Sequence, residues 1–211
     1  MRFICKNPSD IVWKLFVYSA LIIMNIATIY PFMYVLSVSI SGPTAVNAGK
    51  VVLYPIGLNF TAYRYILSDS MMLSSYVNTI VYAVSTTILV LFLCTLTAYP
   101  LSCSTYSKRN IIMKYFTFTM YFSGGMIPTY LVVRSLGLYD TMWAFILPGV
   151  ISAFNVIIFR TFFKEIPDSM RESALIDGAS EMSIYARIFL PLSKPILATI
   201  GLFTMVGQWN N

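Results

Sequence analysis

The sequence predicts an all-α, polytopic integral membrane protein built as a helical bundle. Hydrophobic residues make up 58% of the 211 residues and charged residues only 10%, against about 25% charged in an ordinary soluble domain. Five stretches also carry no charge over nearly all of the roughly 20 residues that a helix needs to cross a bilayer. Because a backbone in lipid must satisfy its own hydrogen bonds, each stretch is expected to be a helix or to be shielded where it is broken.

The five charge-free stretches divide the chain into membrane and loop segments. A first span is expected at 15–40, after a cytoplasmic N-terminus at 1–14. It is too long for the apolar region of a secretory signal peptide, so we interpret it as a retained anchor. An outer loop follows at 41–70, and 71–211 is expected to form one membrane domain. Its expected parts are spans at about 74–102, 115–133, 141–159 and 195–211, and a polar loop at 160–194.

The basic residues predict how the chain is oriented. With a cytoplasmic N-terminus, 11 of the 14 Lys and Arg residues fall in inner segments, and only Lys50, Arg64 and Arg134 fall outside. Positively charged loops stay in the cytoplasm during insertion, so 160–194 is predicted to be cytoplasmic as well. The net charge of +6 therefore reports topology. A nucleic-acid partner is not expected, because it would need a basic patch on a soluble face.

Two segments are expected to depart from regular helix. The loop at 41–70 is rich in Gly and Pro, which predicts an irregular turn region followed by a short amphipathic helix at 59–67. Within the third span, Gly124, Gly125 and Pro128 weaken or remove helical hydrogen bonds. Two interpretations stay open there: close packing of helices through small residues, or a kink that lines a translocation path.

The composition also disfavours several kinds of chemistry. The chain has no His, and Cys5, Cys94 and Cys103 have neither metal-ligand nor CxxC spacing, so no catalytic residue and no metal ligand are predicted. The expected spans contain no charged residue, which disfavours an ion-coupled carrier. The phosphate-binding pattern G-x-x-x-x-G-K-[ST] does not occur, so an ATPase must be a separate polypeptide.

The polar loop at 160–194 predicts two short helices. Pro167 suits a first-turn position, and residues 169–172 fit a capping box, so the first helix would end near Asp177. A compact helical element between two spans can dock a soluble motor and pass on its rigid-body motion.

The end of the first helix and the limits of the second are predicted from single residues. Gly178 can adopt the left-handed conformation that ends a helix, and Ser180 can cap the next one. Pro191 is expected to stop that second helix. The loop is therefore expected to form a helix-turn-helix that lies under the membrane.

The same loop carries a pattern with fixed spacing. Glu172-Ser173-Ala174 is followed after three residues by Gly178, and after nine more by Ile188, Leu190 and Pro191. This pattern resembles the EAA signature of bacterial ABC-importer permeases, from which it departs only where Ser173 replaces an alanine. The resemblance implies a coupling helix pair that seats in a groove of an ATP-binding-cassette subunit. The residues that it implicates in coupling are Glu172, Ser173, Ala174, Asp177, Gly178, Ile188, Leu190 and Pro191.

Each of these coupling residues also has a purely structural explanation when taken singly. Glu172 can cap its own helix, Asp177 and Gly178 can form the turn, and Pro191 can end the second helix.

Flanking segments at 126–131, 136–141 and 143–148 resemble the MalG-type carbohydrate subgroup of these permeases. The resemblance implies a multi-pass protein of the bacterial plasma membrane, surrounded by lipid, that moves a sugar or oligosaccharide by alternating access. The implied partners are ABC ATPase subunits, a second permease subunit in a heterodimer and an extracytoplasmic solute-binding protein. ATP and Mg would bind to the ATPase, and this chain would hold no cofactor and would not be an enzyme. Such permeases continue past the last expected span, so a C-terminal helix or helices are expected to be missing.

A sugar path would need uncharged hydrogen-bonding groups and aromatic faces inside the bundle. The candidates are Asn78, Tyr82, Tyr121 and Asn155, with Asn25 and Tyr99 as further members. Each aromatic ring can instead pack or anchor at the interface, and each Asn can instead bond within the bundle. A permease for another solute class and a non-transporting membrane scaffold or receptor remain alternatives.

Overall fold

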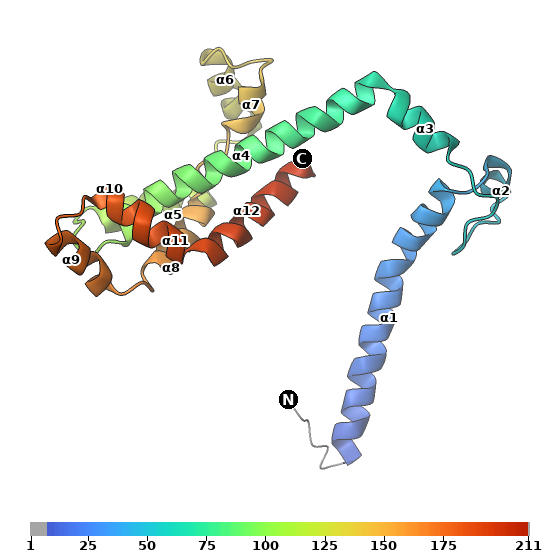
Figure 1. The fold of residues 1–211 in the computed structure, drawn as a ribbon, viewed down its shortest axis with the longest axis horizontal. Coiled ribbons are helices and arrows are strands. Elements are labelled where there is room, and N and C mark those ends of the chain that lie inside the picture. Colours follow the sequence, from blue (N-terminus) through green and yellow to red (C-terminus); the bar gives the residue numbers. More distant parts are fainter. Residues whose placement is uncertain (1–7, 211) are drawn as a thin grey trace. The chain divides into compact units, whose positions relative to one another are not determined.

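The computed structural model describes residues 8–210, which are helical apart from short connections (Figure 1). The chain divides into two compact units, one extending to Leu73 and the other starting at Ser74, inside the helix α4 (Ser70–Ser102). Cys5 and the other residues of 1–7, half of the segment 1–14, lie outside the described residues.

The first unit contains α1 (Pro8–Ser39), α2 (Pro43–Asn47) and α3 (Thr61–Ser68). The Ser37 hydroxyl donates to the carbonyl of Leu53 over 2.6 Å, and the Ser41 hydroxyl accepts from the amide of Ile56 over 3.1 Å. These bonds fasten the irregular segment after α2 to the end of α1. The expected helix at 59–67 is present as α3, and the Asn59 side chain accepts from the amide of Thr61 just before it.

The second unit is built on α4, which is followed by a series of shorter helices. These are α5 (Arg109–Tyr121), α6 (Met126–Ser135), α7 (Met142–Ile146), α8 (Ala153–Phe163), α9 (Asp168–Ile176), α10 (Glu181–Ile184), the π-helical turn Tyr185–Phe189, α11 (Leu190–Leu192) and α12 (Lys194–Trp209).

Within this unit, α12 runs antiparallel to α4 (Figure 1). The rings of Tyr76 and Trp209 lie 6.4 Å apart at one end of the pair. Midway, Gly201 packs so closely on α4 that a Cβ atom there would lie 3.3 Å from the Leu91 side chain. The antiparallel pair of α4 and α12 thus forms the centre of the second unit, and α8 packs against this pair through its contact with α12.

The five expected spans are only partly confirmed. Among residues 8–210, two helices are long and apolar enough to cross a membrane: α1, over Ile11–Ser39, and α4. A third counts only if α12 is joined to the helix before it, from which it bends by 78°. Neither 115–133 nor 141–159 forms one continuous helix.

The third and fourth expected spans are each interrupted where the sequence weakens a helix. The expected span at 115–133 breaks between α5 and α6, where Gly125 has φ +83°. Pro128 has no amide hydrogen and its ring crowds the carbonyl four residues earlier, at Gly124. The expected span at 141–159 breaks between α7 and α8 at Pro148 and Gly149, the latter with φ +93°.

The end of α4 that meets the shorter helices is capped by two arginines. Arg160 of α8 donates to the carbonyl of Leu101 over 2.9 Å, and Arg109 at the start of α5 donates to the carbonyl of Cys103, also over 2.9 Å. Carbonyls in the last turn of a helix, such as that of Leu101, lack a helical partner, and cations are favourable at a helix C-terminus. The carbonyl of Cys103, just past that end, also accepts from the amide of Tyr106 over 3.4 Å. The two arginines therefore fix α5 and α8 against the end of α4.

Truncating the core should destabilise the fold much more than truncating the surface of the same helix. Phe163 is 1% exposed and Phe154 57% exposed, and both belong to α8. We expect Phe163→Ala to cost about 3 kcal/mol or more and Phe154→Ala much less, in thermal unfolding of the purified protein in detergent. Equal losses for the two variants would contradict the packing described here.

Candidate functional site

The first helix of the loop at 160–194 begins differently from its prediction. Helix α9 starts at Asp168, with Pro167 as its N-cap residue and no side chain bonded at the cap. The predicted capping box at 169–172 is therefore wrong, because Ser169 already lies inside the first turn. The negative charge of Asp168 at this end still favours the helix.

The turn after α9 confirms the predicted roles of Gly178 and Ser180. Gly178 has φ +80° and its amide donates to the carbonyl of Leu175 over 3.0 Å, while the amide of Ala179 donates to the carbonyl of Ala174 over 2.9 Å. This pair of bonds is the Schellman arrangement that closes a helix end. The Ser180 hydroxyl then accepts from the amide of Ser183 and caps α10.

The second helix ends one residue after Pro191, so the predicted end at this proline is correct to within one residue. The helical backbone continues from α10 through the π-helical turn into α11, which ends at Leu192, and the bend into α12 follows at Ser193. Pro191 cannot donate a backbone hydrogen bond, and the widened π-helical turn lies directly before α11.

The eight residues that the EAA resemblance implicates in coupling divide into two groups by exposure. The exposed group comprises Glu172, Ser173, Asp177, Gly178 and Pro191. The partly buried group, which packs against the hydrophobic core, comprises Ala174, Ile188 and Leu190. One group is thus open for contact with another protein, and the other holds the helices to the bundle.

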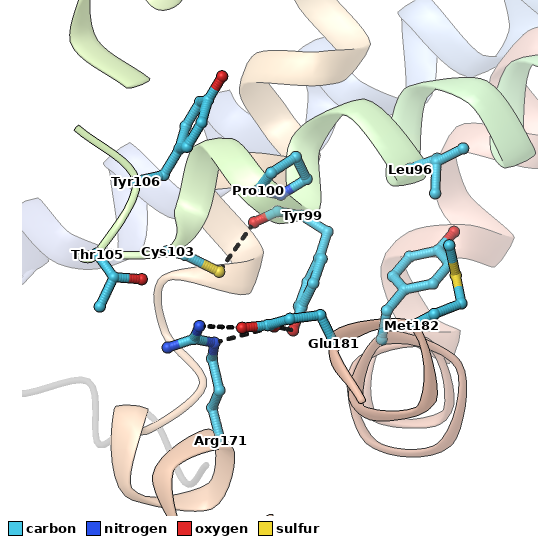
Figure 2. Close-up of a pocket in the computed structure, with 10 residues that line it drawn as sticks. Leu96, Tyr99, Pro100, Cys103, Thr105, Tyr106, Arg171, Glu181 and Met182 are labelled. Carbon is cyan, nitrogen blue, oxygen red and sulfur yellow. Dashed lines mark hydrogen bonds and ion pairs between the residues drawn. The ribbon is translucent and has the colours of Figure 1, made fainter. Parts of the chain in front are cut away.

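Arg171, Glu181 and Tyr99 form a hydrogen-bonded cluster that sequence reasoning did not identify (Figure 2). Arg171 of α9 donates hydrogen bonds from two of its nitrogens to the Glu181 carboxylate, and the one from Nε to Oε2 measures 3.3 Å. The same Oε2 accepts the Tyr99 hydroxyl of α4 over 2.6 Å. Three separate helices therefore meet at one carboxylate.

The Arg171 guanidinium and the Glu181 carboxylate each stabilise the charged form of the other. Both groups lie in the loop at 160–194, outside the expected spans. The hydrogen bond from Arg171 lowers the pKa of the Glu181 carboxyl below its ordinary value. The same bond raises the pKa of the Arg171 guanidinium. The side chain of Arg171 is 12% exposed and that of Glu181 50%, so water screens only part of the pair.

An aromatic cluster holds α4 and the second helix together beside this carboxylate. The Tyr99 ring packs 5.4 Å from Tyr185 and 4.9 Å from Phe189, between ring centres. The hydroxyl of Tyr185 is hydrogen-bonded to that of Thr95 over 2.8 Å. A cavity of about 380 Å³ opens next to the cluster, and Figure 2 shows Arg171, Glu181 and Tyr99 together on its wall.

The structure does not gather the four sugar-path candidates into one cavity. Tyr121 is 79% exposed and lines a cavity of about 490 Å³ that the other three do not line. Tyr82 packs against Phe145, with 5.5 Å between their rings, and Asn155 lies in the first turn of α8. Asn78 is exposed on α4.

The two further path candidates have partners close by. The Asn25 amide donates to the carbonyl of Leu21, one turn earlier in α1, over 2.8 Å. The Tyr99 hydroxyl is bonded to Glu181, so its role is to join helices. In the part of the chain that the structure describes, no group of three or more His, Cys, Asp or Glu side chains is placed to hold a metal ion.

Residues 99–211 match the family described as binding-protein-dependent transport system inner membrane component. The chain is 42% identical over 198 residues to the polygalacturonan/rhamnogalacturonan transport system permease protein YtcP of Bacillus subtilis (strain 168), covering 94% of this chain and 69% of that protein. It is 44% identical to Protein LplC of the same strain, covering 87% of this chain and 62% of that protein. It is 28% identical to the trehalose transport system permease protein SugB of Mycobacterium tuberculosis, covering 86% of this chain and 67% of that protein.

A solved structure resembles the whole fold. It is the crystal structure of a bacterial ABC transporter involved in the import of the acidic polysaccharide alginate. The match has a TM-score of 0.94 at 36% sequence identity, and it covers 100% of this chain and 75% of that one. The helix breaks and the helix pair at 160–194 therefore belong to a fold that an ABC transporter uses.

Gly178→Ala should destabilise the turn between α9 and α10. The left-handed backbone at Gly178 costs an ordinary residue about 1–2 kcal/mol, and since no other atom lies within 4 Å of a Cβ at this position, backbone strain is the whole effect. Gly207→Ala, inside α12 and equally open, is the control and should be neutral or stabilising. Thermal unfolding in detergent measures both, and equal shifts would contradict the assignment.

The contribution of the Glu181 ion pair should depend on pH. Because the folded-state pKa of Glu181 is lowered, its stabilisation is fully present above the unfolded value of about 4.3 and is lost as the pH falls through the folded value. Wild type should therefore be more stable than Glu181→Gln at pH 6–7, and the difference should shrink as the pH falls below the unfolded value of about 4.3. A difference in thermal unfolding that does not shrink as the carboxyl is protonated would contradict the pairing.

Proposed function

Because the chain belongs to the binding-protein-dependent transport system inner membrane components, we propose that it forms part of the solute path of an importer for a sugar or oligosaccharide. The protein is a permease component of an ABC transporter, and the ATPase is a separate subunit. The observation that carries the proposal is the helix pair at 160–194, whose first helix has no buried residue, in a chain whose fold resembles that of a transporter involved in alginate import.

Helix α9 is the proposed contact with the ATPase. It has nine residues and none of them is buried, so this helix gains little from the core of its own chain. A short exposed helix is marginal by itself in water, which favours a partner surface that covers it. Glu172, Asp177 and Gly178 are the residues proposed to lie at that contact, on the exposed side of the helix and its turn.

The proposed substrate class rests on the relatives and on the chemistry of the spans. YtcP is described as transporting polygalacturonan and rhamnogalacturonan, SugB as transporting trehalose, and the matched structure as importing alginate. All of these are carbohydrates. The four path candidates, Asn78, Tyr82, Tyr121 and Asn155, offer amides and aromatic rings of the kind that bind sugars.

The two helix breaks supply a further part of the proposed path. A cavity of about 880 Å³ is lined by Gly124 and Gly125 from one break and by Pro148 from the other. The Tyr130 and Tyr139 rings meet edge to face on its wall, 6.0 Å apart. Irregular backbone at membrane depth is tolerated where it is buried in protein or lines a watery cavity, and transporters build substrate sites from such broken helices. This favours the earlier interpretation of Gly124 and Gly125 as a kink along the path.

The proposed complex places the N-terminus and the loop at 160–194 in the cytoplasm, as the distribution of basic residues favours. ATPase subunits would bind there, with ATP and Mg. A second permease subunit would complete the path within the membrane, and an extracytoplasmic binding protein would deliver the sugar to the side of α3. Movement of the helix pair would then open the path alternately to the two sides of the membrane.

Glu172→Lys should release the ATPase while leaving the permease folded. Reversing an exposed charge on α9 disrupts a contact with a partner but touches no buried residue. Glu165→Lys, which reverses an exposed charge before α9, is the matched control. Co-purification with the ATPase in detergent measures the effect, and retention of the ATPase by Glu172→Lys would contradict the proposed contact.

Uptake by the reconstituted transporter tests the substrate class. Proteoliposomes holding the complete complex should take up oligogalacturonides, alginate oligomers or trehalose when ATP is supplied, because the similar proteins are described as transporting carbohydrates. Uptake of peptides or of amino acids in place of every carbohydrate would contradict the proposal of a sugar importer.

A further inference from the structure

Helix α9 is fastened to the rest of the chain by very few contacts. None of its residues is buried. The carbonyls of its last turn accept hydrogen bonds from the amides of Gly178 and Ala179 in the turn that follows, and Ala174 packs on the hydrophobic core. Its side-chain hydrogen bond to another element is the one from Arg171 to Glu181.

The helices that follow are fastened much more firmly. Ile184, Tyr185 and Phe189 are buried at 1%, 4% and 4% exposure, and the last two pack on Tyr99. A force applied to α9 from outside can therefore bend the Gly178 turn without moving these helices, unless a side chain connects α9 to them directly.

We propose that Arg171, Glu181 and Tyr99 form the link that makes α9 and the end of α4 move as one body. The proposal rests on the proposed docking of α9 to the ATPase. Arg171 holds Glu181 through a two-nitrogen fork, a geometry that restricts rotation as well as distance. Glu181 in turn accepts the Tyr99 hydroxyl of α4, a helix that is long and apolar enough to cross a membrane. In this proposal all three are positioning residues, because they act through α9 and α4.

The arrangement around Tyr99 separates the link from ordinary packing. The ring of Tyr99 is held by Tyr185 and Phe189, whereas its hydroxyl serves Glu181. Tyr99→Phe therefore removes the link and keeps the ring contacts. Arg171→Ala removes the link from the other side, at a residue whose helix has no buried side chain. Arg187→Ala, an exposed arginine in the unspecified part of the EAA spacing, is the matched control.

The experiment uses the complete transporter in proteoliposomes and measures three quantities for each variant: bound ATPase, ATP hydrolysis and sugar uptake. Arg171→Ala and Tyr99→Phe should keep the ATPase and continue to hydrolyse ATP. Sugar taken up per ATP hydrolysed should fall about fivefold or more, the low end of the range for coupling between distant sites. The double variant Arg171→Glu, Glu181→Arg restores an opposite-charge pair. It should recover much of the sugar uptake per ATP hydrolysed that either single variant loses.

A ratio within about twofold of wild type in Arg171→Ala, with the ATPase bound, would overturn the link. Loss of the ATPase from Arg171→Ala would also overturn it, since Arg171 would then be a contact residue. Failure of the underlying docking proposal looks different, because Glu172→Lys would then keep its ATPase whatever the Arg171 and Tyr99 variants do. A lowered ratio in Arg187→Ala would show a general effect of removing charge and would likewise count against the link.

Discussion

The carboxylate of Glu181 is the point through which α9, α10 and α4 are joined. It accepts hydrogen bonds from Arg171 on one side and from Tyr99 on the other. Burial alone would leave α9 loosely attached, because that helix has no buried residue. A hydrogen-bonded charge pair is directional where apolar contact is not, so it can fix the orientation of an exposed helix at low cost in buried area. The aromatic cluster of Tyr99, Tyr185 and Phe189 then carries that orientation into the bundle.

A second constraint acts on the rest of the second unit. Irregular backbone within a membrane must be buried in protein or line a water-filled cavity. The breaks at Gly125 and Gly149 interrupt two expected spans, and residues of both breaks or their neighbours line one cavity. By contrast, α4 runs unbroken and carries the packing of α12. In the proposed importer, the long helix α4 would transmit motion, and the interrupted helices beside it would form the part of the path that opens.

Sequence reasoning succeeded where the signal was local and failed where it was not. Gly178 and Ser180 were predictable, because a left-handed position and a hydroxyl cap depend on a few neighbouring residues. A kink near Gly124, Gly125 and Pro128 was one of two interpretations that the sequence allowed, and the chain breaks there at 122–125. The break at 147–152 was missed, since hydropathy registers the absence of charge and not the loss of a helical bond at Pro148. The Arg171–Glu181–Tyr99 cluster could not be found, because Tyr99 and Glu181 are 82 positions apart and no periodic pattern joins them.

The central claim is that the turn after α9 lies against the ATPase, and a cross-link tests it most directly. In a full-length chain whose native cysteines are replaced, Asp177→Cys should form a disulfide or a short bifunctional cross-link with the ATPase in membranes, at a yield that changes when ATP is added. Tyr54→Cys, on the exposed segment after α2, should form none. Cross-linking at Tyr54 with none at Asp177 would contradict both the docking site and the proposed orientation in the membrane.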